Sequence, residues 1–163
     1  MLLLEFRVGA DRYALEASQV TEVLPLVNLR AVPQAPAGIA GMFDFRGVPV
    51  PVIDLSALLV NRPAQPCMST RLVIVGYPDA AGEMRALGLI AERVTRTVVR
   101  QPEDFMDSGI THDRAWYLGP VCSDTDGLLQ WIDVSQLLPA AVRDVLFRTR
   151  GDAPWPSLNS NAC

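Results

Sequence analysis

A seven-residue segment recurs almost unchanged in this chain. It reads Ile-Asp-Leu-Ser-Ala-Leu-Leu at 53–59 and Ile-Asp-Val-Ser-Gln-Leu-Leu at 132–138, with five positions identical and a separation of 79 residues. A second pair of segments, 15–21 and 89–95, shares four residues at a separation of 74. Two similarities in the same order and at nearly the same separation indicate one module of roughly 70 residues that occurs twice.

The size of the repeat limits how the two modules can fold. Half of the 163 residues are hydrophobic, which is enough for one compact unit. Each module alone would leave too much of its surface in water. We therefore expect a single domain over 1–150, with two lobes at roughly 9–66 and 67–147 around a shared core. An N-terminal strand exchanged between the lobes is compatible with this division. Residues 151–163 lack periodicity, which predicts a flexible tail.

Strand patterns dominate the chain. Apolar residues alternate with period two in the first segment, 2–8, and short apolar runs separated by turn residues follow as far as 132. Residues 17–24 place apolar side chains at helical spacing, which predicts a short helix that ends at Pro25. A further strand is expected at 28–32. Asp54 and Asp133 each precede a short helical pattern and read as helix N-caps. These patterns predict an all-β fold built from barrels, with a final helix that ends near Phe147.

Composition and motifs argue against several classes of function. The net charge is −4 and all 14 basic residues are Arg, which disfavours non-specific binding to nucleic acid. Phosphate-binding glycine motifs are missing. His112 is the single histidine, and no second His or Cys is available to form a metal site with it. The segment 124–127 fits a turn better than a calcium loop, since its twelfth position is Ser135. We expect no enzyme, no cofactor and no metal.

The cysteines and the hydropathy pattern indicate the cellular compartment of the protein. Cys67, Cys122 and Cys163 are odd in number and far apart, which is typical of reduced proteins. The first four residues do not form a leader peptide, because Glu5 and Arg7 interrupt the apolar run. No run is long enough to span a membrane. A cytoplasmic protein without membrane insertion is expected.

The stretch 34–59 contains a specific pattern, made by Pro36, Ile39, Gly41, Arg46, Gly47, Val48, Pro51, Val52, Ile53, Asp54 and Leu55. This pattern resembles the signature of the CheW family of chemotaxis coupling proteins, in which an Asn-Leu-Arg-Gly turn is followed by Pro-Val-Ile-Asp-Leu. Segments 13–23, 87–94 and 132–138 are also similar to family motifs. The resemblance covers about residues 2–147.

Membership of this family would imply both a fold and a role. The fold would be two SH3-like, five-stranded β-barrels packed around a shared hydrophobic core, with short helices and a C-terminal helix. The role would be that of a non-catalytic scaffold, or adaptor, without a cofactor. It would couple the cytoplasmic tips of methyl-accepting chemoreceptors to the regulatory domain of a CheA-type histidine kinase. Such a protein is a monomer on its own and is recruited to membrane receptor arrays through its partners.

The resemblance also implies which residues bind the receptor and the kinase. Arg46 occupies the arginine of the family turn and is expected to bind the receptor, although an ion pair with the local Asp44 would explain it too. The receptor-binding set is Arg46, Glu22, Phe45 and Val23, and the kinase-binding set is Val20, Leu24, Gly41 and Met42. Val20 and Leu24 could equally be core residues, and Phe45 could be a buried strand residue. Gly41 fits a close backbone approach or an unusual φ.

Two departures from the family pattern matter. Asp44-Phe45 stands where the family has Asn-Leu, and the tail from Gly151 has no family counterpart. Both suggest a specialised pathway, such as surface sensing or an alternative form of motility. The competing hypothesis is a small β-barrel that binds another ligand, such as single-stranded nucleic acid. It is disfavoured by net acidity and by 11 aromatic residues that do not cluster with Arg.

Overall fold

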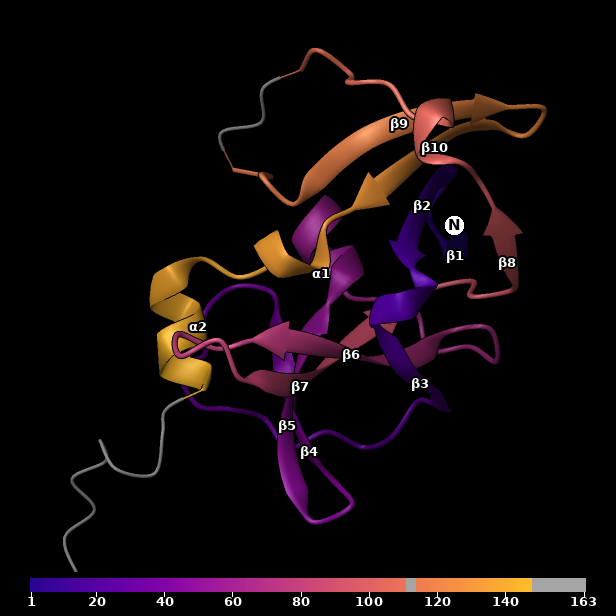
Figure 1. Cartoon of the computed structure of the whole chain (residues 1–163). Coiled ribbons are helices and arrows are strands. Elements are labelled where there is room, and N and C mark those ends of the chain that lie inside the picture. Colours follow the sequence, from indigo (N-terminus) through magenta and orange to yellow (C-terminus); the bar gives the residue numbers. More distant parts are fainter. Residues whose placement is uncertain (111–113, 148–163) are drawn as a thin grey trace, which may run out of the picture.

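The computed structural model describes residues 1–110 and 114–147, and this part of the chain folds into two five-stranded sheets (Figure 1). The first has the order β8-β1-β2-β10-β9. Its strands are β1 (Leu2–Val8), β2 (Asp11–Glu16), β8 (Arg96–Val99), β9 (Leu118–Asp124) and β10 (Gly127–Ile132). The second has the order β3-β6-β7-β5-β4. Its strands are β3 (Val20–Pro25), β4 (Ile39–Phe45), β5 (Val48–Asp54), β6 (Arg71–Pro78) and β7 (Met84–Ala91). The all-β prediction is confirmed.

Helical segments are short and connect the strands. The α-helices are α1 (Leu55–Val60) and α2 (Ala140–Leu146), and the 3-10 helices are η1 (Ala17–Gln19), η2 (Pro102–Asp104) and η3 (Val134–Gln136). None of the helices in the described residues could cross a membrane. Asp54 caps α1 by accepting hydrogen bonds from the amides of Ser56 and Ala57 at 2.9 and 3.2 Å. Asp133 caps η3 in the same way through Ser135 at 3.0 Å. Both predicted caps are confirmed.

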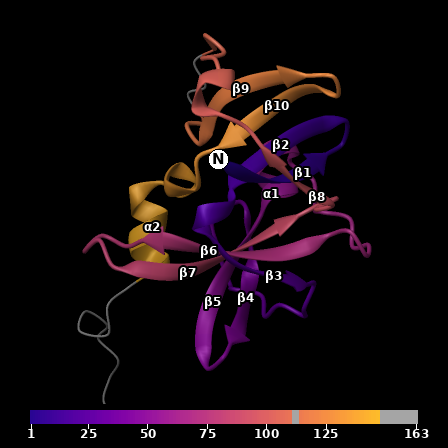
Figure 2. The ribbon, with the colours of Figure 1, turned by 45° about the vertical axis from the view of Figure 1, so that its right-hand side comes forward.

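Each sheet draws strands from both halves of the chain. β1 and β2 join β8, β9 and β10, whereas β6 and β7 join β3, β4 and β5. The repeated segments occupy equivalent places, because β10 runs parallel to β2 and β5 runs parallel to β7 at the centre of the two sheets. The chain is therefore a duplication in which the first two strands of each copy have been exchanged (Figure 2). The sheets do not coincide with the expected lobes 9–66 and 67–147, which remain a prediction.

The segment that follows each edge strand crosses to the opposite edge of the same sheet. Arg30, after β3, forms an antiparallel bridge with Met42 of β4, and Met106, after β8, forms one with Val121 of β9. These bridges curl each sheet towards closure, and each of them pairs backbone groups of one edge strand, β4 or β9.

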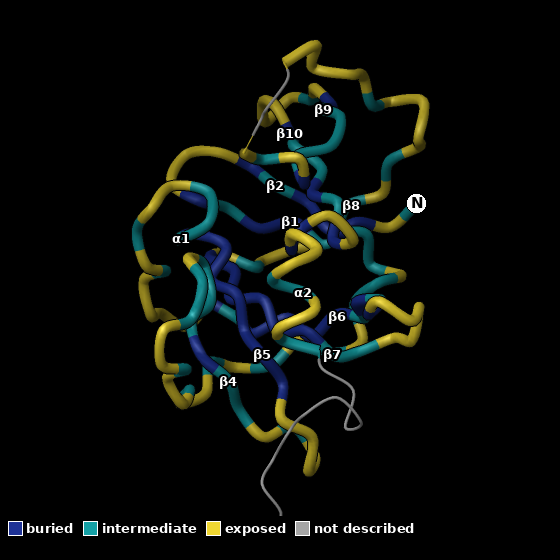
Figure 3. Tube along the Cα trace, turned by 90° about the vertical axis from the view of Figure 1, so that its left-hand side faces the viewer, coloured by how far each residue is buried: buried dark blue, intermediate teal, exposed yellow. Residues whose placement is uncertain are grey.

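The main hydrophobic core lies where the two sheets meet. It contains Phe6 and Leu15 from the first sheet and Ile53, Val73 and Leu89 from the second, all 2% exposed or less. Buried residues run through both sheets in Figure 3. The shared core predicted from the repeat length is present.

Two local predictions are wrong. The helix predicted over 17–24 is limited to η1, and residues 20–25 form β3 instead. Val20 and Val23 are β-branched and pair with β6, while Thr21 lies at the register shift between Val20 and Glu22. Tertiary pairing therefore overrides the helical spacing. The strand predicted at 28–32 is reduced to the single bridge at Arg30.

Candidate functional site

The β4–β5 hairpin presents Arg46 at its tip. Phe45 and Val48 form the last pair of the two strands, so Arg46 and Gly47 make a two-residue turn. Their φ angles are +53° and +84°, as hairpin turns that match the strand twist require. The Asp44 carboxylate accepts a hydrogen bond from the Gly47 amide at 2.6 Å. The turn is thereby fixed, while the Arg46 side chain remains 73% exposed.

The Arg46 side chain contacts two other predicted receptor-binding residues, Glu22 and Phe45. Its Nη2 atom lies 2.9 Å from Oε2 of Glu22 on β3, and its guanidinium carbon lies 4.8 Å from the centre of the Phe45 ring. Arg46 thus pairs with Glu22, and the alternative ion pair with Asp44 does not form. An exposed ion pair of this kind stabilises a fold by only about 0.2–1 kcal/mol. Its main effect is to orient the guanidinium.

An open groove of about 550 Å³ lies beside Arg46, and its walls are β3, the segment 27–30 and β4. Its apolar lining residues are Leu24, Val27, Met42, Phe43 and Phe45. Glu22, Arg30, Asp44 and Arg46 supply charge at its margins. The groove combines an apolar floor with both signs of charge, which suits a protein segment better than a small polar substrate.

Gly41 allows one wall of this groove to form. The Arg30 amide donates to the Met42 carbonyl at 2.8 Å, and the Met42 amide donates to the Arg30 carbonyl at 2.9 Å. A Cβ on Gly41 would lie 2.6 Å from the Arg30 carbonyl oxygen, and the φ of Gly41 is +152°. Both expectations for this glycine, a close backbone approach and an unusual φ, are confirmed.

The other predicted site residues do not all lie at the groove. Val23 is 42% exposed, but successive strand side chains point to opposite faces, so it faces away from Glu22 and Leu24. Val20 is partly buried against the main core, and Leu24 lines the groove while packing on the smaller core of the second sheet. The structure therefore brings together Arg46, Glu22, Phe45, Leu24 and Met42.

Three groove residues were not among the predicted site residues. Val27 precedes the strand expected at 28–32, and Asn28 and Arg30 lie within it, but nothing in that strand pattern pointed to a binding surface. Their position follows from the single bridge to Met42, which depends on tertiary pairing. An Arg near an apolar residue in a loop is the only feature that could have suggested them.

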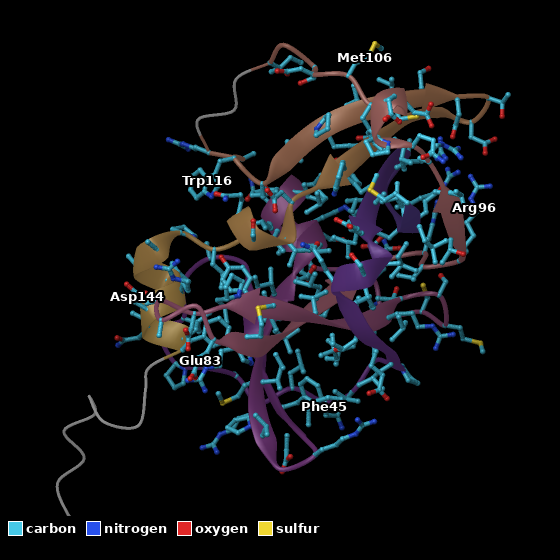
Figure 4. All side chains as sticks on the ribbon, viewed as in Figure 1. Phe45, Glu83, Arg96, Met106, Trp116 and Asp144 are labelled. Atoms are coloured by element: carbon cyan, nitrogen blue, oxygen red, sulfur yellow. The ribbon has the colours of Figure 1, made fainter. Side chains whose placement is uncertain are left out.

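The equivalent corner of the first sheet is closed by internal ion pairs. Arg96 of β8 lies 2.8 Å from Asp126 in the β9–β10 turn. Beneath this pair, the buried Arg12 contacts Glu5 at 3.0 Å and Asp124 at 2.7 Å. Hydrogen bonds from Arg12 hold the pKa of Asp124 well below its usual range. Figure 4 shows Arg96 well separated from Phe45, which lies on the other hairpin.

Groups that could perform chemistry are sparse in the described residues. They contain no cluster of three His, Cys, Asp or Glu residues that could hold a metal. His112 and Cys163 lie outside the described residues. Cys122 is buried and Cys67 is exposed. Hydrogen bonds with Ser69 and Thr70 lower the pKa of the Cys67 thiol to about 7.

Comparisons with known proteins agree on one family. The model of the CheW-like domain matches residues 2–142. The chain is 27% identical over 137 residues to the chemotaxis protein CheW of Treponema pallidum, covering 83% of this chain and 80% of that protein. It is 31% identical over 93 residues to a probable chemotaxis protein CheW of Rhizobium etli, which is 57% of each chain. The crystal structure of the scaffolding protein TtCheW from Thermoanaerobacter tengcongensis has the same fold. Its TM-score is 0.71 at 21% identity, with 94% of this chain and 91% of that chain covered.

Proposed function

This chain belongs to the CheW-like family, and its relatives include a chemotaxis protein and a scaffolding protein; we therefore propose that it couples methyl-accepting chemoreceptors to a CheA-type histidine kinase. It would do so as a monomeric adaptor at the cytoplasmic face of a receptor array, which it would join through its partners. Holding both partners in one assembly lets a change in the receptor bias the kinase without any reaction on the adaptor itself.

The oriented Arg46 side chain is the observation that carries this proposal. Glu22 engages one terminal nitrogen of the guanidinium, so the N–H groups on Nε and Nη1 stay available to a partner carboxylate or carbonyl. The adjoining groove offers apolar surface from Leu24 and Met42. A receptor segment with an acidic residue would pair with Arg46 at the margin of this groove, and the apolar surface of Leu24 and Met42 would be left for the kinase.

The division of residues between the two partners is part of the proposal. Arg46, Glu22 and Phe45 would contact the receptor, joined by Val23 from the other face of β3. The kinase would contact Val20, Leu24, Gly41 and Met42. Since Leu24 and Met42 line the same groove as Arg46, the two partners would meet along one continuous surface.

The test is co-sedimentation with a receptor cytoplasmic fragment and a kinase regulatory domain from the same genome. Arg46→Ala should weaken receptor binding by about 10-fold or more, as the loss of a charged interface contact does. Arg143→Ala is the control, because it removes an arginine of α2 that pairs with Asp144 at 3.3 Å and whose side chain is 30% exposed. It should bind normally.

A charge-swapped variant separates recognition from local structure. In Glu22→Arg combined with Arg46→Glu, the intramolecular ion pair can form again, but the charge offered to the partner is reversed. Continued loss of receptor binding supports direct contact. Full recovery would mean that the pair serves only the fold, and a wild-type protein that binds neither partner would refute the coupling role.

We further propose that the pathway is a specialised one, such as surface sensing or an alternative form of motility. Asp44 and Phe45 replace the Asn-Leu of the family turn, and Phe45 stacks under the guanidinium of Arg46. The double variant Asp44→Asn, Phe45→Leu should shift preference towards receptors of a general swimming pathway. Unchanged preference among a panel of receptor fragments would contradict this.

A further inference from the structure

A surface pocket of the first sheet, here called the Trp131 pocket, lies where β2 and β10 end. It has a volume of about 310 Å³ and is lined by Glu16, Gln19, Gly119, Pro120, Trp131 and Asp133. In Figure 1, β9 and β10 lie at the opposite end of the molecule from the β4–β5 hairpin that carries Arg46. The Trp131 pocket is therefore separate from the Arg46 groove.

The parallel pairing of β2 and β10 brings two carboxylates together in this pocket. Trp131 pairs with Ala14, and residues two positions further along each strand lie on the same face, which places Asp133 beside Glu16. Like charges at neighbouring cross-strand positions destabilise a sheet. No arginine is among the described residues that line the pocket. The two negative charges thus face a common space without a positive charge in its walls.

The second sheet contains the same position, but there the chain itself supplies what the carboxylate needs. By the repeat, Asp54 is the counterpart of Asp133, and it pairs in parallel register with Ile90. Ile90 is the counterpart of Glu16, so no second negative charge is present. The Asp54 carboxylate caps α1 through Oδ1 and accepts a hydrogen bond from the Ala64 amide at 2.8 Å through Oδ2. One copy of the module therefore fills both carboxylate oxygens from within.

In the first sheet each carboxylate is oriented by a serine through only one oxygen. The Ser18 hydroxyl donates to Oε1 of Glu16 at 2.9 Å. Ser135 donates to Oδ1 of Asp133 from its amide at 3.0 Å and from its hydroxyl at 2.7 Å. Within the part of the chain that the structure describes, no group donates to Oε2 of Glu16 or to Oδ2 of Asp133. The pocket thus presents two acceptor oxygens to an external donor.

Trp131 gives the pocket an aromatic wall. Its ring packs on Phe105 with the ring centres 5.3 Å apart, and Pro120 adds a second rigid apolar surface. A guanidinium stacks on an indole and donates to carboxylates through a planar set of N–H groups, whereas an ammonium is a compact point charge. A metal ion fits less well, because the described residues hold no cluster of three His, Cys, Asp or Glu side chains.

We propose that the Trp131 pocket binds an arginine side chain of a partner protein. The guanidinium would lie on the indole of Trp131 and donate to Oε2 of Glu16 and Oδ2 of Asp133. The net charge of −4 opposes association between copies of this chain, so the partner is a different protein with a basic surface. This contact is additional to the coupling role and does not depend on it.

Titration of the full chain with the peptide acetyl-Gly-Arg-Gly-amide, followed by proton–nitrogen correlation NMR, tests the proposal. The indole N–H of Trp131 and the amide of Gly119 should shift in a saturable way, with a Kd of about 1 mM, because one side chain makes few contacts. The indole N–H of Trp116 is the reference, since it does not line this pocket. The same peptide with citrulline in place of arginine has the same shape without the charge and should cause no shift. An equal response to both peptides, or no saturation below about 50 mM arginine peptide, overturns the proposal.

Two conservative variants test which groups hold the guanidinium. Glu16→Gln and Asp133→Asn each remove one charge. Each keeps an oxygen that can accept the hydrogen bond from Ser18 or Ser135, so the fold is preserved. Either change should weaken binding of the arginine peptide by about 10-fold, as the loss of a charge-assisted contact does. Asp144→Asn is the control, because it removes a charge from a side chain of α2 that is 55% exposed and outside the pocket. Equal weakening in all three variants would leave only net charge as the cause and would refute the site.

Two further outcomes bear on the occupant. The corresponding lysine peptide should bind more weakly than the arginine peptide, and equal binding would rule out a site built for a guanidinium. The Trp131 indole resonance should not depend on the concentration of the chain alone. A shift with concentration would identify a second copy of this chain as the occupant and would contradict the assignment to a different protein.

Discussion

Replacing Gly41 by Ala should destabilise the second sheet far more than the same change at Gly47. At Gly41 the new Cβ would lie 2.6 Å from the Arg30 carbonyl oxygen, with φ at +152°. At Gly47, φ is +84° and nothing lies within 4 Å of the new atom. Both substitutions force a side chain into backbone space that favours glycine, but only the first also forces two segments apart.

The expected magnitudes follow from these two terms. An unfavourable backbone conformation costs about 1–3 kcal/mol, and overpacking in a tight site adds about 1–3 kcal/mol. Gly47→Ala should therefore lower the free energy of unfolding by about 1–2 kcal/mol, the usual penalty for a left-handed residue. Gly41→Ala should lower it by about 3–5 kcal/mol when both terms act. The difference between the variants isolates the clash with the Arg30 carbonyl.

Urea denaturation measures both values, and hydrogen exchange locates the effect. In Gly41→Ala the amides of Arg30 and Met42, which bond each other's carbonyls, should exchange faster than in Gly47→Ala. Equal destabilisation by the two variants would refute the reasoning. It would show that the segment 29–30 moves aside freely and that the groove wall is not fixed by Gly41.

Three further predictions concern titration, capping and reactivity. The pKa of Asp124 is held below the value of an unfolded Asp, so its stabilising effect is complete above about pH 4 and is lost as the pH falls towards its folded pKa. Urea midpoints at pH 6 and pH 3 should differ less in Asp124→Asn than in the wild type, and an equal difference would contradict this. Asp54→Ala should lower the free energy of unfolding by about 2 kcal/mol and Asp133→Ala by about 1 kcal/mol, as measured by thermal unfolding. The larger loss is expected at Asp54 because its carboxylate also accepts a hydrogen bond from a third backbone amide. A larger loss in Asp133→Ala would be inconsistent with this account of the caps. The Cys67 thiol, with a pKa of about 7, should react with iodoacetamide at pH 7.5 well before the buried Cys122. Peptide mapping measures the two rates, and equal rates would exclude an activated thiol at Cys67.

Features with a local cause could be predicted from the sequence. The caps at Asp54 and Asp133 and the hairpin turn at Arg46 each depend on a few neighbouring residues. The glycine at position 41 was expected from the family signature, whereas its cause, the Arg30 carbonyl, lies in a distant segment. The repeated segments also pointed to a duplicated all-β chain, because their apolar residues occupy the same core positions in both copies. Arg46 and Phe45 could be placed at a turn for the same reason.

Features that arise from distant pairing could not be predicted. Residues 17–24 have helical spacing, yet β6 recruits most of them into β3. The partner of Arg46 is Glu22, 24 residues away, whereas the nearer Asp44 is engaged by the Gly47 amide. Periodicity says which face of a segment is apolar, but it does not say which strand will lie beside it.

The exchange of strands between the two copies sets the order in which the sheets can form during synthesis. All strands of the second sheet have been made once residue 91 has left the ribosome, so that sheet can close early. β1 and β2 are the first strands to emerge, yet they cannot complete their sheet until β10 arrives at residue 132. The strands that are made first are therefore the last to have all their partners, and Leu3 and Phe6 stay exposed to solvent until then. The nascent chain is least protected in the interval between the closing of the second sheet and the completion of the first.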